Sequence, residues 1–260
     1  MLKSFGISGR ECAVELGLLS SNADIGKVVW FYGEENPDDF KVVYEGRTSV
    51  LVHSSGKKII GAEHLSAAAL AFPNCQFKLN APQGELPLLD GSAKLWKTAL
   101  ENAVEADPSV CSTRFDKLHF YNFPEKEFEI KMNNRFIKYQ RSDEDCLEIK
   151  YDIERFGQSF SASVKINSTK DLEKIFLART YIFAEELPSV GLSENLRGCG
   201  IVLGTDEILF ENEPAFHKIL DFLGDITLYA GILPYGRFEI YNGGHEMHHR
   251  VQNQWQPLRS

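Results

Sequence analysis

The sequence predicts an α+β protein made of two similar layered domains, each with a β-sheet and helices, the helices packed between the two sheets. Two observations support this fold class. Short β-rich runs are followed by helical patterns, and this order occurs twice along the chain. A polar segment, 105–109, that contains a proline separates the two halves. We therefore expect an N-terminal domain over residues 1–108 and a C-terminal domain over residues 109–260.

In the first half, β-branched and aromatic residues alternate with Gly, Asn and Asp up to about residue 51, which is typical of short strands. The individual strands predicted in this half are 27–32, 41–44 and 76–79. The helices predicted in it are 62–72, which Pro73 stops, and 92–104. Within the segment 90–93, Asp-Gly-Ser-Ala, a turn and a helix cap are expected rather than a catalytic role.

In the second half, the same patterns predict strands first and helices after them. The strands expected in this half are 117–120, 128–131, 136–140, 147–151, 160–164, 200–203, 207–210 and 237–241. A helix is expected over about 170–179, and another around His217, with Asn212 as its cap and Pro214 in its first turn. A helix or loop should begin at Gly243.

Composition limits the class of protein. A chain of 260 residues with 43% hydrophobic residues can bury a sizeable core, and its net charge of −9 argues against a non-specific nucleic-acid binder. No apolar run approaches the length of a membrane span, and the first residues lack the apolar core of a signal peptide. We expect a cytoplasmic monomer that binds a small molecule.

The cysteines exclude one kind of metal site. The chain has 5, an odd number, scattered and without a Cys-x-x-Cys pair. They are Cys12, Cys75, Cys111, Cys146 and Cys199, and most should be buried small hydrophobes. A metal site in this chain would therefore use histidine and carboxylate ligands, the combination that leaves zinc an open catalytic position.

The helix around His217 carries the strongest chemical signal. His217, Asp221 and Asp225 are four residues apart, so they stack on one helix face that is otherwise apolar. An imidazole and a carboxylate so placed could bind one metal ion together. The alternative is a structural histidine hydrogen-bonded to an acid one turn away, and the local pattern leaves both readings open.

Two other places combine titratable groups with small neighbours. Glu63 and His64 begin a predicted helix, where the acid could simply be favoured by the helix dipole and the histidine could be part of the interior. His245 follows two glycines and, taken alone, reads as a loop residue. His248 and His249 are expected to be exposed or to support the site, and the remaining histidines, His53 and His119, to be structural.

Several blocks together resemble a known family. They are Glu63-His64-Leu65, Glu85-Leu-Pro-Leu-Leu-Asp90-Gly91-Ser92-Ala93, Ala178-Arg179-Thr180, His217-Lys218-x-Leu220-Asp221-x-x-Gly224-Asp225 and Gly244-His245. Their order and approximate spacing are similar to those of UDP-3-O-acyl-N-acetylglucosamine deacetylases, zinc enzymes at the committed step of lipid A synthesis. The resemblance runs from about Thr48-Ser49 to His245.

The resemblance implies a ligand set and catalytic roles. His64, His217 and Asp221 would bind Zn²⁺, Glu63 would be the general base, and His245 would be the general acid. Four more residues receive supporting roles. Thr180 would help to hold the tetrahedral intermediate, Asp225 would orient His245, and Lys218 and Tyr181 would contact the acylated UDP-amino-sugar.

The chain also departs from the family pattern. The expected Gly-Leu-His-Ser-Gly is Phe5-Gly-Ile-Ser-Gly9, Thr-Val before Glu-His is Gly61-Ala62, and Ala-Leu-Asn-Asn after His245 is Glu246-Met-His-His249. The chain is shorter than typical members, mainly between Thr180 and His217, where the family shapes a passage for the acyl chain. Two alternatives stay open: a related zinc deacetylase acting on another N-acetyl sugar, and a non-catalytic metal- or nucleotide-binding relative.

Overall fold

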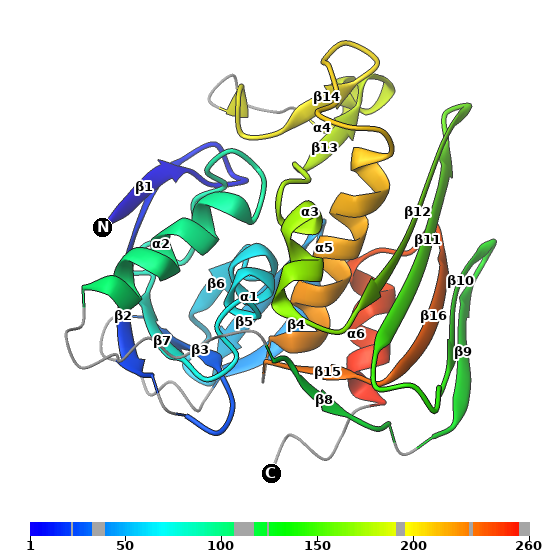
Figure 1. Cartoon of the computed structure of the whole chain (residues 1–260). Coiled ribbons are helices and arrows are strands. Elements are labelled where there is room, and N and C mark those ends of the chain that lie inside the picture. The colour runs from blue at the N-terminus through cyan, green and yellow to red at the C-terminus, as the bar shows by residue number, and fades with distance from the viewer. Residues whose placement is uncertain are drawn as a thin grey trace.

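The computed structural model describes residues 1–21, 23–32, 40–106, 117–123, 125–190, 196–228 and 231–254. Figure 1 shows helices between two groups of strands, one built from the beginning of the chain and one from its second half. The predicted α+β class, with helices packed between sheets, is confirmed. The predicted boundary at residue 108 lies outside the described residues, and the division into domains stays a prediction.

The first half builds two sheets and two helices. The strands are β1 (Leu2–Phe5), β2 (Glu11–Ser20), β3 (Lys27–Phe31), β4 (Phe40–Glu45), β5 (Thr48–His53), β6 (Lys58–Ile60) and β7 (Gln76–Asn80), and the helices are α1 (Glu63–Ala69) and α2 (Lys94–Glu105). One sheet has the order β1-β2-β7-β3, and the other has the order β4-β5-β6. The alternating burial of β2 directs apolar residues toward α2, and the alternating burial of β3 directs them toward α1.

The second half forms one five-stranded sheet and two separate pairs of strands. Its strands are β8 (His119–Tyr121), β9 (Glu127–Met132), β10 (Arg135–Gln140), β11 (Leu147–Arg155), β12 (Gln158–Ile166), β13 (Tyr181–Phe183), β14 (Ile201–Leu203), β15 (Ile232–Pro234) and β16 (Gly236–Tyr241). Its helices are α3 (Glu173–Phe176), α4 (Leu187–Val190), α5 (Glu213–Thr227) and α6 (His245–Asn253), with 3₁₀ turns at Thr169–Leu172 and Ala184–Glu186. The five-stranded sheet has the order β12-β11-β16-β10-β9.

Helix α5 joins the two halves. It packs on α1 from the first half and on β11, β12 and α6 from the second (Figure 1). Except for Lys218, all of its residues are buried. A 15-residue helix with so little exposed surface must find partners for every polar side chain that it carries.

Several sequence predictions need correction. Residues 207–210 form no strand, because the amide of Leu209 donates to the Glu213 carboxylate (2.6 Å) instead of joining a ladder. Asn212 precedes α5 in a left-handed conformation and does not cap it; its side-chain oxygen accepts from the amide of Ser161. The helix expected over 170–179 is a 3₁₀ turn followed by the single turn α3.

Other predictions agree with the structure. The described cysteines, Cys12, Cys75, Cys146 and Cys199, are free and buried, whereas Cys111 lies outside the described residues. His53 contacts Ser55 and His119 contacts Asn74. Within the described part of the chain, no helix is long and apolar enough to cross a membrane.

Candidate active site

The close contact of α1 with α5 creates the site. At Gly224, a Cβ atom would collide with the backbone carbonyl of Glu63, so only glycine lets the two helices approach this closely. Glu63 and His64 form the first turn of α1, and the contact carries them next to the polar stripe of α5. The glycine of the His217-to-Asp225 motif therefore has a packing role.

Three side chains from these two helices converge on one point. Nε2 of His64 and Nε2 of His217 each lie 3.3 Å from the same carboxylate oxygen of Asp221. The two imidazole rings are perpendicular, with centroids 5.0 Å apart. Nδ1 of His217 lies 3.2 Å from the carbonyl oxygen of Ala178, so Nδ1 donates there and Nε2 keeps a lone pair toward Asp221.

This group fits a metal ion. Its ligand atoms all lie within 4.8 Å of one another, and the three side chains are buried. Burial lowers the pKa of His217 to about 3, which keeps the imidazole neutral, as a metal ligand requires. Burial also opposes the charge on Asp221, but His217 and Lys218 outweigh it and hold the pKa of Asp221 well below its ordinary value. Two imidazoles and a carboxylate are ligands that zinc accepts.

Glu63 is held beside this group by the start of β5. Its carboxylate accepts a hydrogen bond from the hydroxyl of Thr48 (2.6 Å) and another from the amide of Ser49 (3.3 Å). Burial raises the pKa of Glu63, although the imidazoles of His245 and His64 act in the opposite direction. The raised pKa brings this carboxylate closer to the range in which it can exchange a proton at neutral pH.

His245 lies at the first turn of α6 and is bound to Asp225. Its Nδ1 donates to a carboxylate oxygen of Asp225 (2.8 Å), and its Nε2 lies 3.7 Å from Asp221. Burial alone would lower the pKa of His245, but Asp225 and Asp221 raise it to about 9. The imidazole is therefore protonated at neutral pH, as a proton donor must be.

His248 and His249 are expected from the sequence to be exposed or to support the site. The structure buries both. Nδ1 of His248 lies 2.7 Å from the same oxygen of Asp225 that His245 contacts, and Nε2 of His249 lies 2.7 Å from the hydroxyl of Ser49. Asp225, His245 and His248 form a second buried group whose ligand atoms lie within 4.8 Å of one another. The i, i+3, i+4 spacing of His245, His248 and His249 indicates a common face if a helix begins at His245.

The Asp-Gly-Ser-Ala segment, 90–93, holds the backbone of Thr180 beside the pocket. The amide of Thr180 donates to the carbonyl of Gly91 (2.7 Å), and a Cβ at Gly91 would lie 2.8 Å from the methyl group of Thr180. The turn expected here is present, because Asp90 accepts bonds from the amide and hydroxyl of Ser92. Ser92 in turn accepts from the amide of Lys94, while the helix-flanking Ala93 makes no side-chain cap.

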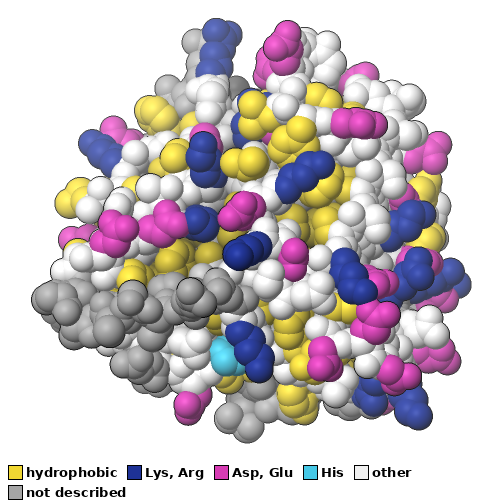
Figure 2. All heavy atoms as spheres, in the orientation of Figure 1, with side chains coloured by type: hydrophobic (Ala, Val, Ile, Leu, Met, Phe, Trp, Pro, Cys, Tyr) yellow, Lys and Arg dark blue, Asp and Glu magenta, His cyan; other side chains and the backbone are white. Residues whose placement is uncertain are grey.

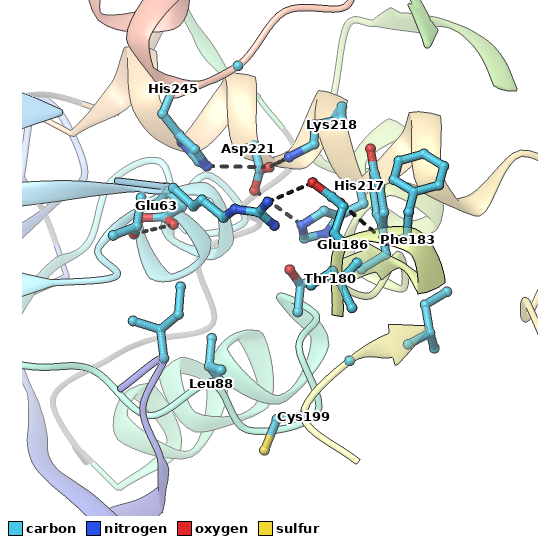
Figure 3. A pocket seen from close by; sticks show the side chains of 18 of the residues that line it. Glu63, Leu88, Thr180, Phe183, Glu186, Cys199, His217, Lys218, Asp221 and His245 are labelled. Carbon is cyan, nitrogen blue, oxygen red and sulfur yellow. Dashed lines mark hydrogen bonds and ion pairs between the residues drawn. The ribbon is translucent and has the colours of Figure 1, made fainter. Parts of the chain in front are cut away.

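Lys218 and Tyr181 lie together on one wall of the pocket. The ammonium of Lys218 donates to Asp221 (2.7 Å) and lies 5.4 Å from the centre of the Tyr181 ring. Figure 3 shows Lys218, Asp221 and His217 along α5, with His245 pointing toward Asp221 from the opposite side. Lys218 is thus already bonded to a residue of the metal-binding group, which the sequence alone did not indicate.

The pocket around these residues is large, about 1660 Å³, and its walls carry apolar, basic and acidic side chains. Of the nine site residues predicted from sequence, Asp225 alone does not line it and lies behind His245. At its rim, Arg47 and Arg155 both contact the buried carboxylate of Glu186, at 2.6 and 2.8 Å. Figure 2 shows hydrophobic side chains next to Lys and Arg in the middle of the face seen there. No local pattern in the sequence indicates the Arg47–Glu186–Arg155 cluster.

The composition of the site is that of a metal-dependent hydrolase: a metal-binding group, a buried carboxylate and a protonated histidine in one pocket. The family model LpxC, UDP-3-O-acyl N-acetylglycosamine deacetylase, matches residues 6–255. The chain belongs to this family.

Individual relatives agree with the family match. A UDP-3-O-acyl-N-acetylglucosamine deacetylase of Legionella pneumophila (strain Corby) is 24% identical over 257 residues, which cover 93% of this chain and 80% of the relative. The protein of that name from Nautilia profundicola is 28% identical, over 80% of this chain and 72% of its own length. The one from Wigglesworthia glossinidia brevipalpis is 25% identical, over 98% and 91%. The similarity is low but extends over nearly the whole chain.

Proposed function

We propose that this protein hydrolyses the acetamide of UDP-3-O-acyl-N-acetylglucosamine and releases acetate, as a step of lipid A synthesis in the cytoplasm. One observation carries the proposal: His64, His217 and Asp221 converge beside Glu63 and His245 in a chain that belongs to the deacetylase family. We further propose that the ion bound by the three ligands is Zn²⁺.

The ion and Glu63 would act together on water. Zn²⁺, when bound, polarises a carbonyl group and lowers the pKa of water toward about 7. Glu63 would accept the proton of the attacking water, because Thr48 and Ser49 hold its carboxylate in the pocket and burial raises its pKa. The lone pair of the carboxylate is thus oriented before substrate binds.

His245 would supply the proton that the leaving amine needs. Asp225 keeps the imidazole charged, and its Nε2 lies on the pocket side, 3.7 Å from Asp221. The cation would also stabilise negative charge on the former carbonyl oxygen, with the hydroxyl of Thr180 as a further donor. Thr180 is partly exposed in the pocket, which suits a donor to a bound molecule.

The remaining pocket residues would position the substrate. Lys218 offers a cation and Tyr181 an aromatic ring on the same wall, a combination that suits a sugar phosphate. Both are partly exposed. We propose that they contact the UDP-amino-sugar next to the reacting acetamide.

The test combines metal analysis with an acetate-release assay on the acylated UDP-sugar. The wild-type protein should contain one zinc per chain and release acetate. Glu63→Gln should keep the zinc and lower kcat by about 10²–10⁴-fold, because it keeps the shape of the side chain but cannot accept a proton. Glu127→Gln, on an exposed position of β9, is the matched control. Acetate release at the wild-type rate by Glu63→Gln would contradict the mechanism.

One observation favours a second candidate, a zinc deacetylase for another N-acetyl sugar. Segments that depart from the family pattern line the pocket, namely Ile7, Ser8, Gly61 and Glu246. Changes at these positions alter the surface that meets the substrate outside the reacting group. Turnover of the UDP-sugar with and without its 3-O-acyl chain separates the candidates. A faster reaction without the acyl chain would favour the second.

A further inference from the structure

One face of α6 carries four polar side chains that lie around Asp225 of α5. His245, His248, His249 and Gln252 have the spacing i, i+3, i+4, i+7, which aligns them along one side of a helix, and all four are buried. Two of them bond directly to the side chain of Asp225 on α5, and Gln252 donates to its backbone carbonyl (3.1 Å). The contact of α6 with α5 is therefore organised around Asp225.

Both oxygens of the Asp225 carboxylate accept hydrogen bonds. One oxygen lies 2.8 Å from Nδ1 of His245 and 2.7 Å from Nδ1 of His248. The other oxygen accepts from the hydroxyl of Ser49, which also contacts His249. Asp225 is fully buried, so each donor replaces hydrogen bonds that water would otherwise make.

The two partners of His248 determine its tautomer. Nδ1 faces a carboxylate oxygen, which only accepts, so Nδ1 carries the hydrogen. Nε2 faces the hydroxyl of Tyr151 (3.2 Å) and accepts its hydrogen. The ring of Phe222 packs at 5.2 Å between centroids and restricts rotation of the imidazole. The result is a buried chain from Tyr151 through His248 and Asp225 to His245.

His248 does not reach the pocket, and Tyr151 does not either. A role for His248 in the reaction must therefore act through Asp225. Two donors on one oxygen hold the plane of the carboxylate, and this plane sets the direction of the His245 imidazole. Without His248, the carboxylate can rotate about its Cβ–Cγ bond, and a buried acceptor loses a donor.

We propose that His248, held by Tyr151, is a positioning residue that fixes the Asp225 carboxylate and thereby aims His245 at the reacting group. The catalytic consequence rests on the proposed deacetylation, whereas the geometry does not. His248 and His249 stand where the family pattern described above has Asn-Asn. The arrangement thus belongs to this chain's own sequence.

Four variants of the zinc-loaded full chain test the proposal. His248→Leu removes both ring nitrogens, and His248→Asn keeps an amide donor near the position of Nδ1. Tyr151→Phe removes only the hydroxyl. Arg250→Ala is the matched control, because Arg250 is exposed on the same helix and contacts only Glu246 among the described ion pairs.

We expect His248→Leu to lower kcat by about 10–100-fold with KM within about twofold of wild type, since the residue does not touch substrate. His248→Asn should recover most of this loss, Tyr151→Phe should lose a few-fold, and Arg250→Ala should behave as wild type. If His248→Leu does not fold, the loss expected in Tyr151→Phe decides. A wild-type kcat in folded His248→Leu would overturn the proposal. If that variant does not fold, a wild-type kcat in Tyr151→Phe would overturn it.

Nitrogen NMR of ¹⁵N-histidine-labelled protein gives a readout that does not depend on activity. The wild type should show His248 protonated at Nδ1 alone. Tyr151→Phe should keep this tautomer, because Asp225 still faces Nδ1, and should shift only the Nε2 signal, which loses its hydroxyl donor. His248→Leu should displace the Nδ1–H signal of His245. If the wild type releases no acetate but these signals respond, the proposed function fails and the positioning stands. If the wild type is active and the signals of His245 do not move, the positioning fails alone.

Discussion

Helix α5 carries two histidine–aspartate clusters one turn apart, and they differ in how tightly they are closed. In the first, His64 and His217 stand 3.3 Å from Asp221, and all three residues line the pocket. In the second, His245 and His248 bond to Asp225 at 2.8 and 2.7 Å, and Asp225 lies away from the pocket. The same residue types thus occur in an open and in a closed arrangement.

The difference shows that the orientation of the imidazole nitrogens decides what each cluster can bind. Around Asp221, His217 turns one nitrogen to a backbone carbonyl and keeps its lone pair for the centre of the group. Around Asp225, both histidines turn Nδ1 to the carboxylate, so the hydrogens occupy the space that an ion would need. We infer that the open cluster binds the metal and that the closed cluster holds the protonated His245, which donates a proton.

The largest effect is expected from a change in the open cluster. Asp221→Ala removes the carboxylate that both histidines face, and two imidazoles alone bind zinc weakly. The variant should lose its zinc and all measurable acetate release. Zinc analysis by mass spectrometry checks this. Retention of one zinc per chain would assign the metal to other ligands.

The matching change in the closed cluster should separate proton transfer from metal binding. Asp225→Asn keeps the shape of the side chain but no longer stabilises the charge on His245. We expect full zinc content and a kcat lowered by about 10²–10⁴-fold, the usual share of a general acid. Loss of zinc from this variant would show that the closed cluster also binds metal.

A change at Gly224 should disturb both clusters at once. A methyl group there collides with the backbone carbonyl of Glu63 and pushes α1 away from α5. Gly224→Ala should cost about 1–3 kcal/mol of unfolding free energy, as overpacked sites usually do, and weaken zinc binding through the displaced His64. Urea denaturation and zinc titration measure the two effects. Unchanged stability would mean that the helices can separate without strain.

The smallest effect on the site is expected from a change at Glu213, the first residue of α5. Burial would raise its pKa, but hydrogen bonds from Arg179 and the amide of Leu209 lower it below the ordinary value. The charged carboxylate therefore adds stability above pH ~4.3, its unfolded pKa, and loses that stability as pH falls through the lower folded pKa.

Glu213→Gln tests this pH dependence. The variant should be less stable than wild type by about 1–3 kcal/mol at pH 7, and the difference should shrink as pH falls below about 4. Urea denaturation at several pH values measures it. Zinc content should be unchanged, since Glu213 contacts neither cluster. A stability difference that grows as pH falls would contradict the assigned ion pair.

Much of the fold could be predicted from the sequence, because strands and helices leave periodic patterns among neighbouring residues. Alternating burial in β9, β11 and the strands beside them appears directly in the residue pattern, as does the helix around His217. Residues 207–210 misled, because Ile and Leu there resemble a strand while the amide of Leu209 is taken by Glu213. Strands such as β6, β13 and β15 have three residues each and are too short for a periodic signal.

For the site, the sequence by itself determined the chemical types and the stacking of His217, Asp221 and Asp225, because helix periodicity is a local property. Only the tertiary structure decided which of these groups meet. His64 reaches Asp221 because Gly224 admits α1, and His248 reaches Asp225 because α6 packs on α5. Contacts across 157 and 23 residues depend on how the helices pack, and no local pattern encodes that distance.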